Sequence, residues 1–274
     1  MSSTAAVAVV AIGLVFLTFT GQCSGALEVG FYQGKCGRFV DVEGIVAGVV
    51  RTKFFRDRTI AAALIRMQFH DCFVNSGGGR YNVQTGRRDG LISLAANVDL
   101  PAPSISVPDS VAAFAGKGLN MTDMVHLLGG HTVGVAHCFL FQDRLYNFQN
   151  TGKPDPDMNV ALLEGLRRIC PQNSAGTNTA NLDQNPQSSF IVDNSFYKEI
   201  VARRGILQID QELALDPITQ ATVTTLANNG TNSFATKFGQ AMVKLGAVEV
   251  LTGSQGEIRR SCRAVNKPGF LTFN

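Results

Sequence analysis

One short stretch of the chain combines side chains that could act together in proton transfer. It contains Arg66, His70 and Asp71, and a helix-prone, nearly uncharged run leads into it. Arg66 and His70 stand four residues apart, so on a helix both side chains lie on the same face. An imidazole can accept a proton near neutral pH, and a guanidinium beside it stays charged. The pair fits a reaction that moves a proton while negative charge develops on a neighbouring oxygen.

For such a pair taken alone, a surface arginine beside a half-buried histidine is the commoner interpretation. A second histidine cluster, residues 129–138, changes the balance. His131 closes an expected helix and is surrounded by glycines and small residues, which leave room for a large flat group to approach the backbone. A histidine that only caps the helix explains this pattern about equally well. Zinc bound by His131, His137 and Cys138 is disfavoured, because no fourth ligand follows at a suitable spacing.

Composition restricts the class of protein. The chain has 274 residues, of which 45% are hydrophobic and 16% charged, as in a globular protein. This length allows a sizeable core in one large domain or two modest ones. The net charge of +3, without a run of Lys or Arg, argues against a nucleic-acid partner.

The first residues indicate secretion. Residues 5–20 form an apolar run that is short for a membrane span, and the small residues Ser24 and Ala26 follow it. We expect a signal peptide over residues 1–26, and no membrane span after its removal. Because no Lys or Arg precedes the apolar run, an uncleaved anchor is the lesser alternative. A secreted chain can carry disulfides and N-glycans, and glycosylation sequons begin at Asn120 and Asn229.

Apolar residues at helical spacing predict a mainly α fold with few strands. Thr59 and the pair Thr122-Asp123 are expected helix N-caps. Residues 81–108 and 171–192 are expected to be loops. The expected helices cover residues 40–58, 60–73, 110–117, 124–130, 136–146, 159–170, 194–204, 218–226 and 232–245.

Six motifs in one order resemble those of the class III secretory plant haem peroxidases. They are residues 69–74, 85–89, 100–103, 130–138, 192–194 and 210–213. The resemblance, which extends from Gly30 to Asn266, implies an all-α haem-peroxidase fold of two helical lobes with haem between them. The domain would cover residues 27–274, with a distal part at 27–117 and a proximal part at 118–274. It also implies a monomer, secreted to the extracellular space or cell wall, or sent to the vacuole.

The resemblance gives the two histidine clusters separate roles. His131 would bind the iron of haem b, and Asp210 would accept its other ring N–H. His70 would move the proton of hydrogen peroxide, and Arg66 would stabilise the charge that develops as the O–O bond breaks. The implied function is reduction of hydrogen peroxide coupled to one-electron oxidation of small phenolic donors.

Further sites follow only from the resemblance. Phe69 would shield the haem and Pro101 would lie near the donor channel, although packing and a turn explain these two residues equally well. Asp71 and Val74 match part of a distal calcium site, and Cys138 would pair with Cys170. A proximal calcium site of oxygen ligands would use Thr132, Asp183, Ser188, Ile191 and Asp193.

The sequence departs from the family after Asn75, where a Ser-Gly-Gly-Gly run replaces several dozen residues, so that part of the distal lobe is missing. The distal calcium site would then be lost. Cys36, Cys72 and Cys262 would lack their partners, and a bond between Cys36 and Cys262 is conceivable. Two alternatives to a working peroxidase remain open: a truncated form with little or no activity, and a non-enzymatic calcium-binding protein of the cell wall.

Overall fold

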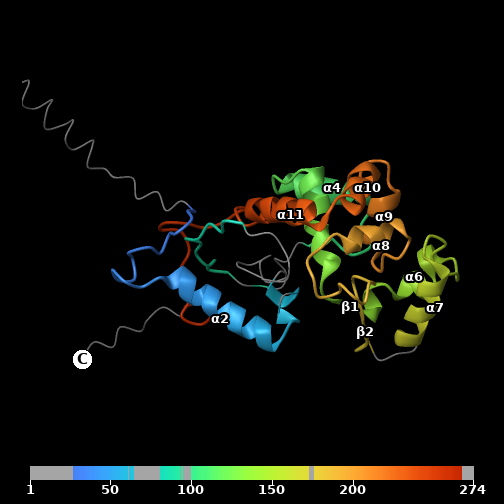
Figure 1. The fold of residues 1–274 in the computed structure, drawn as a ribbon, viewed down its shortest axis with the longest axis horizontal. Helices are drawn as coiled ribbons and strands as arrows, with labels where there is room; N and C mark the ends of the chain where they lie inside the picture. The colour runs from blue at the N-terminus through green and yellow to red at the C-terminus, as the bar shows by residue number, and fades with distance from the viewer. Residues whose placement is uncertain are drawn as a thin grey trace, which may run out of the picture. The chain divides into compact units, whose positions relative to one another are not determined.

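The computed structural model describes residues 27–60, 62–64, 81–92, 94, 100–172 and 176–266. The chain divides into two compact units. The smaller unit comprises Met1–Leu27, Gly86–Ser93 and Leu251–Asn274, and the larger comprises Glu28–Thr85 and Leu94–Val250. The described part is mainly helical with one small sheet, so the expected class is confirmed (Figure 1).

The larger unit holds the helices and the sheet that the structure describes. Its α-helices are α2 (Val42–Arg56), α4 (Val107–Gly116), α5 (Met121–Leu128), α6 (Gln142–Tyr146), α7 (Val160–Ile169), α8 (Ser195–Val201), α9 (Gln208–Leu215), α10 (Gln220–Asn228) and α11 (Thr231–Leu245). Its short 3-10 helices are η2 (Gly129–Thr132), η3 (Cys138–Leu140) and η4 (Phe148–Asn150). Strand β1 (Val135–His137) pairs antiparallel with β2 (Thr179–Asn181), with Ala136 opposite Ala180.

Long periodic helices agree with the sequence prediction, whereas several of the shorter elements differ from it. Helices α2, α7 and α11 lie within the ranges expected for them or within one residue of those ranges. The helix expected over 136–146 is wrong in its first half, where β1 and η3 precede α6, because this segment pairs with β2. The segment 171–192, expected to be a loop, contains that partner strand. Helix α9 was not expected. Of the helix expected over 60–73, only residues 60 and 62–64 lie within the described residues, and these are helical.

The helix N-cap predicted at Thr122-Asp123 is wrong. Helix α5 begins earlier than expected, because the Asn120 side chain accepts a hydrogen bond from the Asp123 N–H (2.8 Å). The Asp123 carboxylate accepts in return from the Asn120 N–H (3.1 Å), which completes a capping box. Thr59 stands at the N-cap position expected for it, directly before helical residue 60, and its carbonyl accepts the Ala63 N–H at 3.2 Å. Thr59 also donates its N–H and its hydroxyl to Asp57. These two bonds lower the pKa of the Asp57 carboxyl.

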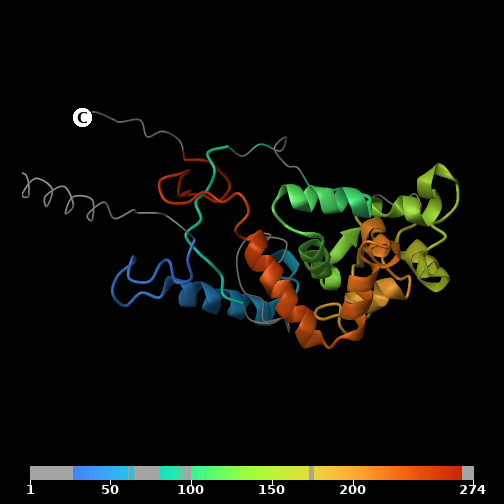
Figure 2. The same cartoon turned by 90° about the horizontal axis from the view of Figure 1, so that it is seen from above.

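The core of the larger unit surrounds α5. Helix α11 packs against α5, and α10 packs against α8 and α9 (Figures 1 and 2). Tyr197 links these layers, because its ring meets Phe234 of α11 edge-on (centroids 5.2 Å apart) and its hydroxyl donates to the Val125 carbonyl (2.9 Å). At Gly129 a Cβ would collide with Tyr197 and Phe234, so only glycine allows the end of α5 to approach this aromatic pair.

The smaller unit is held by backbone pairing between its two described segments. Asp89 and Glu257 exchange N–H···O bonds of 2.8 and 2.9 Å, and Arg88 N–H donates to the Leu251 carbonyl (2.9 Å). Gly256 has a φ of +58°, and a Cβ there would collide with the Asp89 carbonyl. The tight pairing therefore requires glycine at this position.

Candidate active site

His131 lies in η2, directly after α5. Asp210, in the first turn of α9, accepts a hydrogen bond from the His131 Nδ1 at 2.8 Å. The Phe196 ring stands edge-on to the imidazole, with centroids 6.1 Å apart. The structure thus brings together two residues that are 79 positions apart in the sequence.

The Asp210 carboxylate influences both the pKa of His131 and the tautomer of its neutral ring. Burial acts to lower the pKa of His131, but the charge and hydrogen bond of Asp210 outweigh it, so the pKa is raised. In the neutral ring the proton shared with Asp210 sits on Nδ1, so the lone pair is on Nε2. The His131 side chain is 30% exposed, whereas that of Asp210 is buried. The imidazole can therefore offer Nε2 to a ligand while the carboxylate holds the other side of the ring.

Among the described residues, the Asp210 carboxylate has a side-chain hydrogen-bond partner for only one of its two oxygens, namely His131. Its second oxygen, Oδ2, is buried without a hydrogen-bond partner in the part of the chain that the structure describes. Its charge, together with burial as the larger cause, raises the pKa of Tyr197 well above the usual value. The phenol of Tyr197 therefore stays neutral. Sequence reasoning missed Tyr197, since a tyrosine in an amphipathic helix resembles any core residue.

An oxygen-rich cluster lies next to His131 in the sequence. The Thr132 hydroxyl donates to the Ile191 carbonyl (3.1 Å) and lies 3.4 Å from Asp193 Oδ1. The Ser188 hydroxyl donates to Asp183 Oδ2 at 3.1 Å. All five residues expected for a proximal calcium site thus take part in contacts with one another. Ser195, which sequence reasoning missed, also lies near this cluster: its hydroxyl is 3.4 Å from Asp183 Oδ1.

The two carboxylates of this cluster are unfavourable as anions. Burial, the largest cause, and the charge of Asp193 among others raise the pKa of Asp183 to about 6. Burial also raises the pKa of Asp193. A cation between them would relieve both effects. The described residues contain no group of three His, Cys, Asp or Glu side chains suited to a metal. A hard cation such as calcium also accepts hydroxyl and carbonyl oxygens as ligands, and this cluster offers both beside its two carboxylates.

The other predicted site residues divide into two groups. Pro101 is exposed, in the loop whose Pro103 carbonyl accepts the Ile209 N–H of α9 at 3.0 Å. The remaining ones lie outside the described residues, namely Arg66, Phe69, His70, Asp71, Cys72 and Val74.

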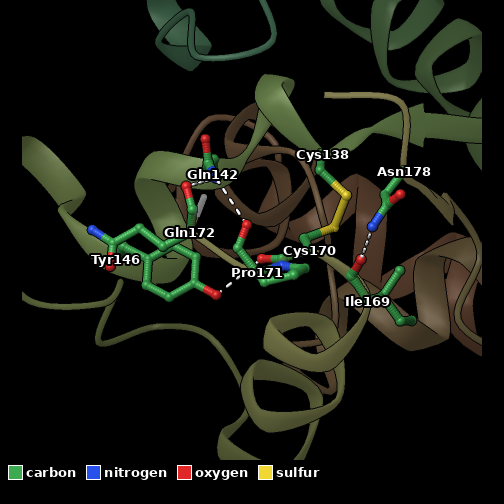
Figure 3. Close-up of a disulfide and its surroundings, with 8 residues drawn as sticks. All are labelled: Cys138, Gln142, Tyr146, Ile169, Cys170, Pro171, Gln172 and Asn178. Carbon is green, nitrogen blue, oxygen red and sulfur yellow. Dashed lines mark hydrogen bonds between the residues drawn. A yellow bond between two sulfur atoms is a disulfide. The ribbon is translucent and has the colours of Figure 1, made fainter. Parts of the chain in front are cut away.

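A disulfide joins Cys138 to Cys170, with Cα atoms 5.5 Å apart (Figure 3). Both cysteines are buried. Tyr146 of α6 donates its hydroxyl to the Cys170 carbonyl at 2.9 Å, so the end of α7 is joined to η3 by the disulfide and to α6 by a hydrogen bond. Cys36 and Cys262 are exposed free thiols.

Comparisons with known proteins identify the family of the chain. Residues 74–229 match the family model described as peroxidase. Peroxidase 60 of Arabidopsis thaliana is 41% identical, over 95% of this chain and 96% of the relative. Peroxidase 5 of Vitis vinifera is 34% identical, over 92% of this chain and 95% of the relative. The chain therefore belongs to the peroxidase family, among the class III secretory enzymes of plants. Haem, calcium, hydrogen peroxide and phenolic donors are general features of that family.

The same comparison bears on the length of the chain. The alignment with Peroxidase 60 covers 324 positions, more than the 274 residues of the whole chain. It must therefore include positions at which the relative has residues and this chain has none.

Among the described residues, no helix has the length and apolar character needed to cross a membrane.

Proposed function

We propose that this chain carries out the peroxidase reaction of its family, and that His131 would bind haem iron with Asp210 as the hydrogen-bond partner of that ligand. The observation that supports this is the 2.8 Å bond between His131 Nδ1 and Asp210 Oδ1. It leaves Nε2 free to bind iron and makes the imidazole a stronger electron donor. Haem b, when bound, supplies the redox-active iron that exchanges electrons with peroxide and with the donor.

We also propose that His70 and Arg66 act on hydrogen peroxide. His70 would take a proton from the bound hydrogen peroxide and return it to the leaving oxygen. Arg66 would stabilise the negative charge on that oxygen. Their spacing of four residues supports this role. Phe69 as a shield of the haem and Pro101 beside the donor channel belong to the same proposal, as do phenolic donors as the substrates.

Calcium has one well-supported site in this proposal. Thr132, Asp183, Ser188, Ile191 and Asp193 would hold it, supported by their mutual contacts and by the raised pKa values of both carboxyls. Asp71 and Val74 alone offer too few oxygens for the six to eight that calcium takes, so we propose that the distal site is lost.

The route through the cell is also part of the proposal. Residues 1–26 would be removed as a signal peptide, and the mature monomer would act outside the cell or in the vacuole. Asn120 and Asn229 would carry glycans, and both are exposed. Both asparagines lie at helix termini: Asn120 is the N-cap of α5 and Asn229 is the C-cap of α10.

The test is reconstitution of the mature chain with haem and calcium. We expect a Soret band and peroxide-dependent oxidation of a phenol such as guaiacol. His131→Ala should lose the spectrum of histidine-bound haem, whereas His137→Ala, at an exposed histidine of β1, should keep it. An unchanged spectrum in His131→Ala would exclude the proposed ligand.

The same experiment decides between the peroxidase and its two alternatives. A Soret band with negligible turnover would indicate the truncated, poorly active form, which the missing residues relative to Peroxidase 60 make worth testing. Folding that depends on calcium but takes up no haem would indicate a non-enzymatic calcium-binding protein. Ordinary turnover would exclude both.

A further inference from the structure

The start of α9, which carries Asp210, is fixed by contacts from outside the helix. Its N-cap residue, Leu207, makes no side-chain capping bond. The three carbonyls at the helix entrance, those of residues 205–207, all accept instead from one atom, Nη1 of Arg144. The three distances are 2.7, 2.6 and 3.0 Å. The position of this turn is therefore tied to one guanidinium.

Arg144 is itself held rigidly. It comes from α6, is almost completely buried, and donates Nε to Asp155 Oδ2 at 2.8 Å. The Asp155 N–H donates to the Arg144 carbonyl (2.9 Å), so backbone and side chain connect the same two residues. A buried ion pair adds little net stability after desolvation, and its best-attested use is to fix one geometry. Here the geometry that it fixes is the approach of the chain to α9.

A second contact holds the same turn from the other side. Gln211, one residue after Asp210, donates Nε2 to the Ile200 carbonyl at 2.9 Å. Its Oε1 accepts from the Gly205 N–H at 3.1 Å. A Cβ at Gly205 would come within 3.1 Å of the Gln211 backbone. The connection between α8 and α9 is thus bonded to Arg144 through its carbonyls and to Gln211 through an N–H.

We propose that Arg144 is a positioning residue of the peroxidase reaction, because it fixes the start of α9 and so keeps the Asp210 carboxylate within hydrogen-bond reach of His131. The inference rests on the proposed role of His131 and Asp210. A hydrogen bond of 2.8 Å is lost after a displacement of about 1 Å. Asp210 Oδ2 has no partner among the described residues, so no other bond of this carboxylate would correct such a displacement.

The variant that tests the inference is Arg144→Lys, which keeps the charge beside Asp155 but loses the planar group that reaches three carbonyls. Arg167→Lys is the matched control, because Arg167 also donates to a backbone carbonyl, that of Leu145, but makes no bond to α9 within the part of the chain that the structure describes. Both are made in the full mature chain, measured with and without haem.

Two measurements without haem report on the position of α9. Amide hydrogen exchange, followed by mass spectrometry, should accelerate by about tenfold in residues 205–215 of Arg144→Lys, the equivalent of one lost hydrogen bond. Exchange in α7 and α11 should not change. The downfield proton NMR signal of the His131 Nδ1–H should broaden or shift. In Arg167→Lys, the amide exchange of residues 205–215 and the NMR signal of the His131 Nδ1–H should match those of the parent chain.

With haem bound, the iron–histidine stretching frequency should fall in Arg144→Lys and stay constant in Arg167→Lys. A folded Arg144→Lys with parental exchange in residues 205–215 and a parental His131 signal would overturn the inference. So would acceleration spread evenly over all helices, which a merely structural role produces. If Arg144→Lys does not fold, Gln211→Met, which loosens the same turn without disturbing the ion pair, is judged by the same two outcomes. Failure of the parent chain to bind haem would reject the proposed function and leave the exchange result valid.

Discussion

Helices α2 and α11 have 15 residues each, but they bury very different surfaces. Helix α11 buries six residues, led by Phe234, Phe238 and Met242, and packs along α5. Helix α2 buries only Phe54, while Phe55 is 75% and Ile45 60% exposed. Since a helix of this length gains most of its stability from packing, α11 is part of the folding core and α2 contributes little to it.

The difference shows that an apolar pattern does not by itself create a partner. The apolar residues of α2 recur at helical spacing and predict a buried face, which the structure leaves largely exposed. Relatives have residues that this chain lacks, since the alignment with Peroxidase 60 is longer than the chain.

The largest expected effect comes from removing a buried ring of α11. Phe234→Ala should lower the free energy of unfolding by about 3–5 kcal/mol, because it opens a cavity between α11, Tyr197 and Gly129. Phe55→Ala in α2 should change it by less than about 0.5 kcal/mol. Urea unfolding followed by circular dichroism measures both. Equal losses in the two variants would show that α2 belongs to the core after all.

Calcium bound at the proposed site around Asp183 and Asp193 should stabilise the larger unit, which contains α11. At a hundred times its dissociation constant, a ligand that binds only the folded state adds about 2.7 kcal/mol to the free energy of unfolding. Calorimetry with excess calcium and with a chelator should show this difference. Asp183→Asn should abolish it, and Asp143→Asn, at an exposed carboxylate, should not. A calcium effect that survives Asp183→Asn would place the ion elsewhere.

Acid should weaken the contact between α5 and α11 through His126. Burial, followed by the charge of Lys237, lowers the pKa of His126 from 6.5 to about 4. Between these two values the unfolded chain binds more protons than the folded one, so stability falls as the pH falls from 6.5 to 4. The loss should be about 1–3 kcal/mol. His126→Gln should remove it in urea titrations at several pH values, whereas the exposed-site variant His137→Gln should retain the full loss.

The smallest effect on stability is expected on the exposed face of α2. Ile45→Glu should change the free energy of unfolding by less than about 0.5 kcal/mol. It should nevertheless reduce the binding of a hydrophobic dye such as ANS, because it divides an exposed apolar surface. Phe54→Ala, at the one buried position of α2, should cost more stability than Ile45→Glu. Unchanged dye binding would mean that this face is not accessible in solution.

Elements that depend on interactions between residues close in the sequence could be predicted, and elements that depend on distant segments could not. Helices α2, α7 and α11 are long and periodic, so local spacing was sufficient. Strand β1 could not be predicted, because its structure depends on pairing with β2, a distant segment. Helix α9 is short, and its entrance is set by Arg144 rather than by a side-chain cap of its own.

The candidate site shows the same limit. The residues around His131 suggested a ligand, but only the resemblance to a family named Asp210 as its partner and connected two residues so far apart. Their hydrogen bond is a product of the packing that brings α9 beside η2. Tyr197 carried no signal in the sequence, since its role depends on a neighbour, Asp210, that only the fold supplies.

The buried disulfide has a consequence for thiol chemistry. Closing the loop between Cys138 and Cys170, separated by 32 positions, stabilises the fold by about 4 kcal/mol in the chain-entropy description. Thiol–disulfide exchange requires a thiolate to reach a sulfur atom, and in the folded chain both sulfurs are shielded while Cys36 and Cys262 are exposed. The bond is therefore protected from reshuffling by the exposed thiols of its own chain. Its rate of reduction by dithiothreitol then reports how often the region around α6 and α7 opens.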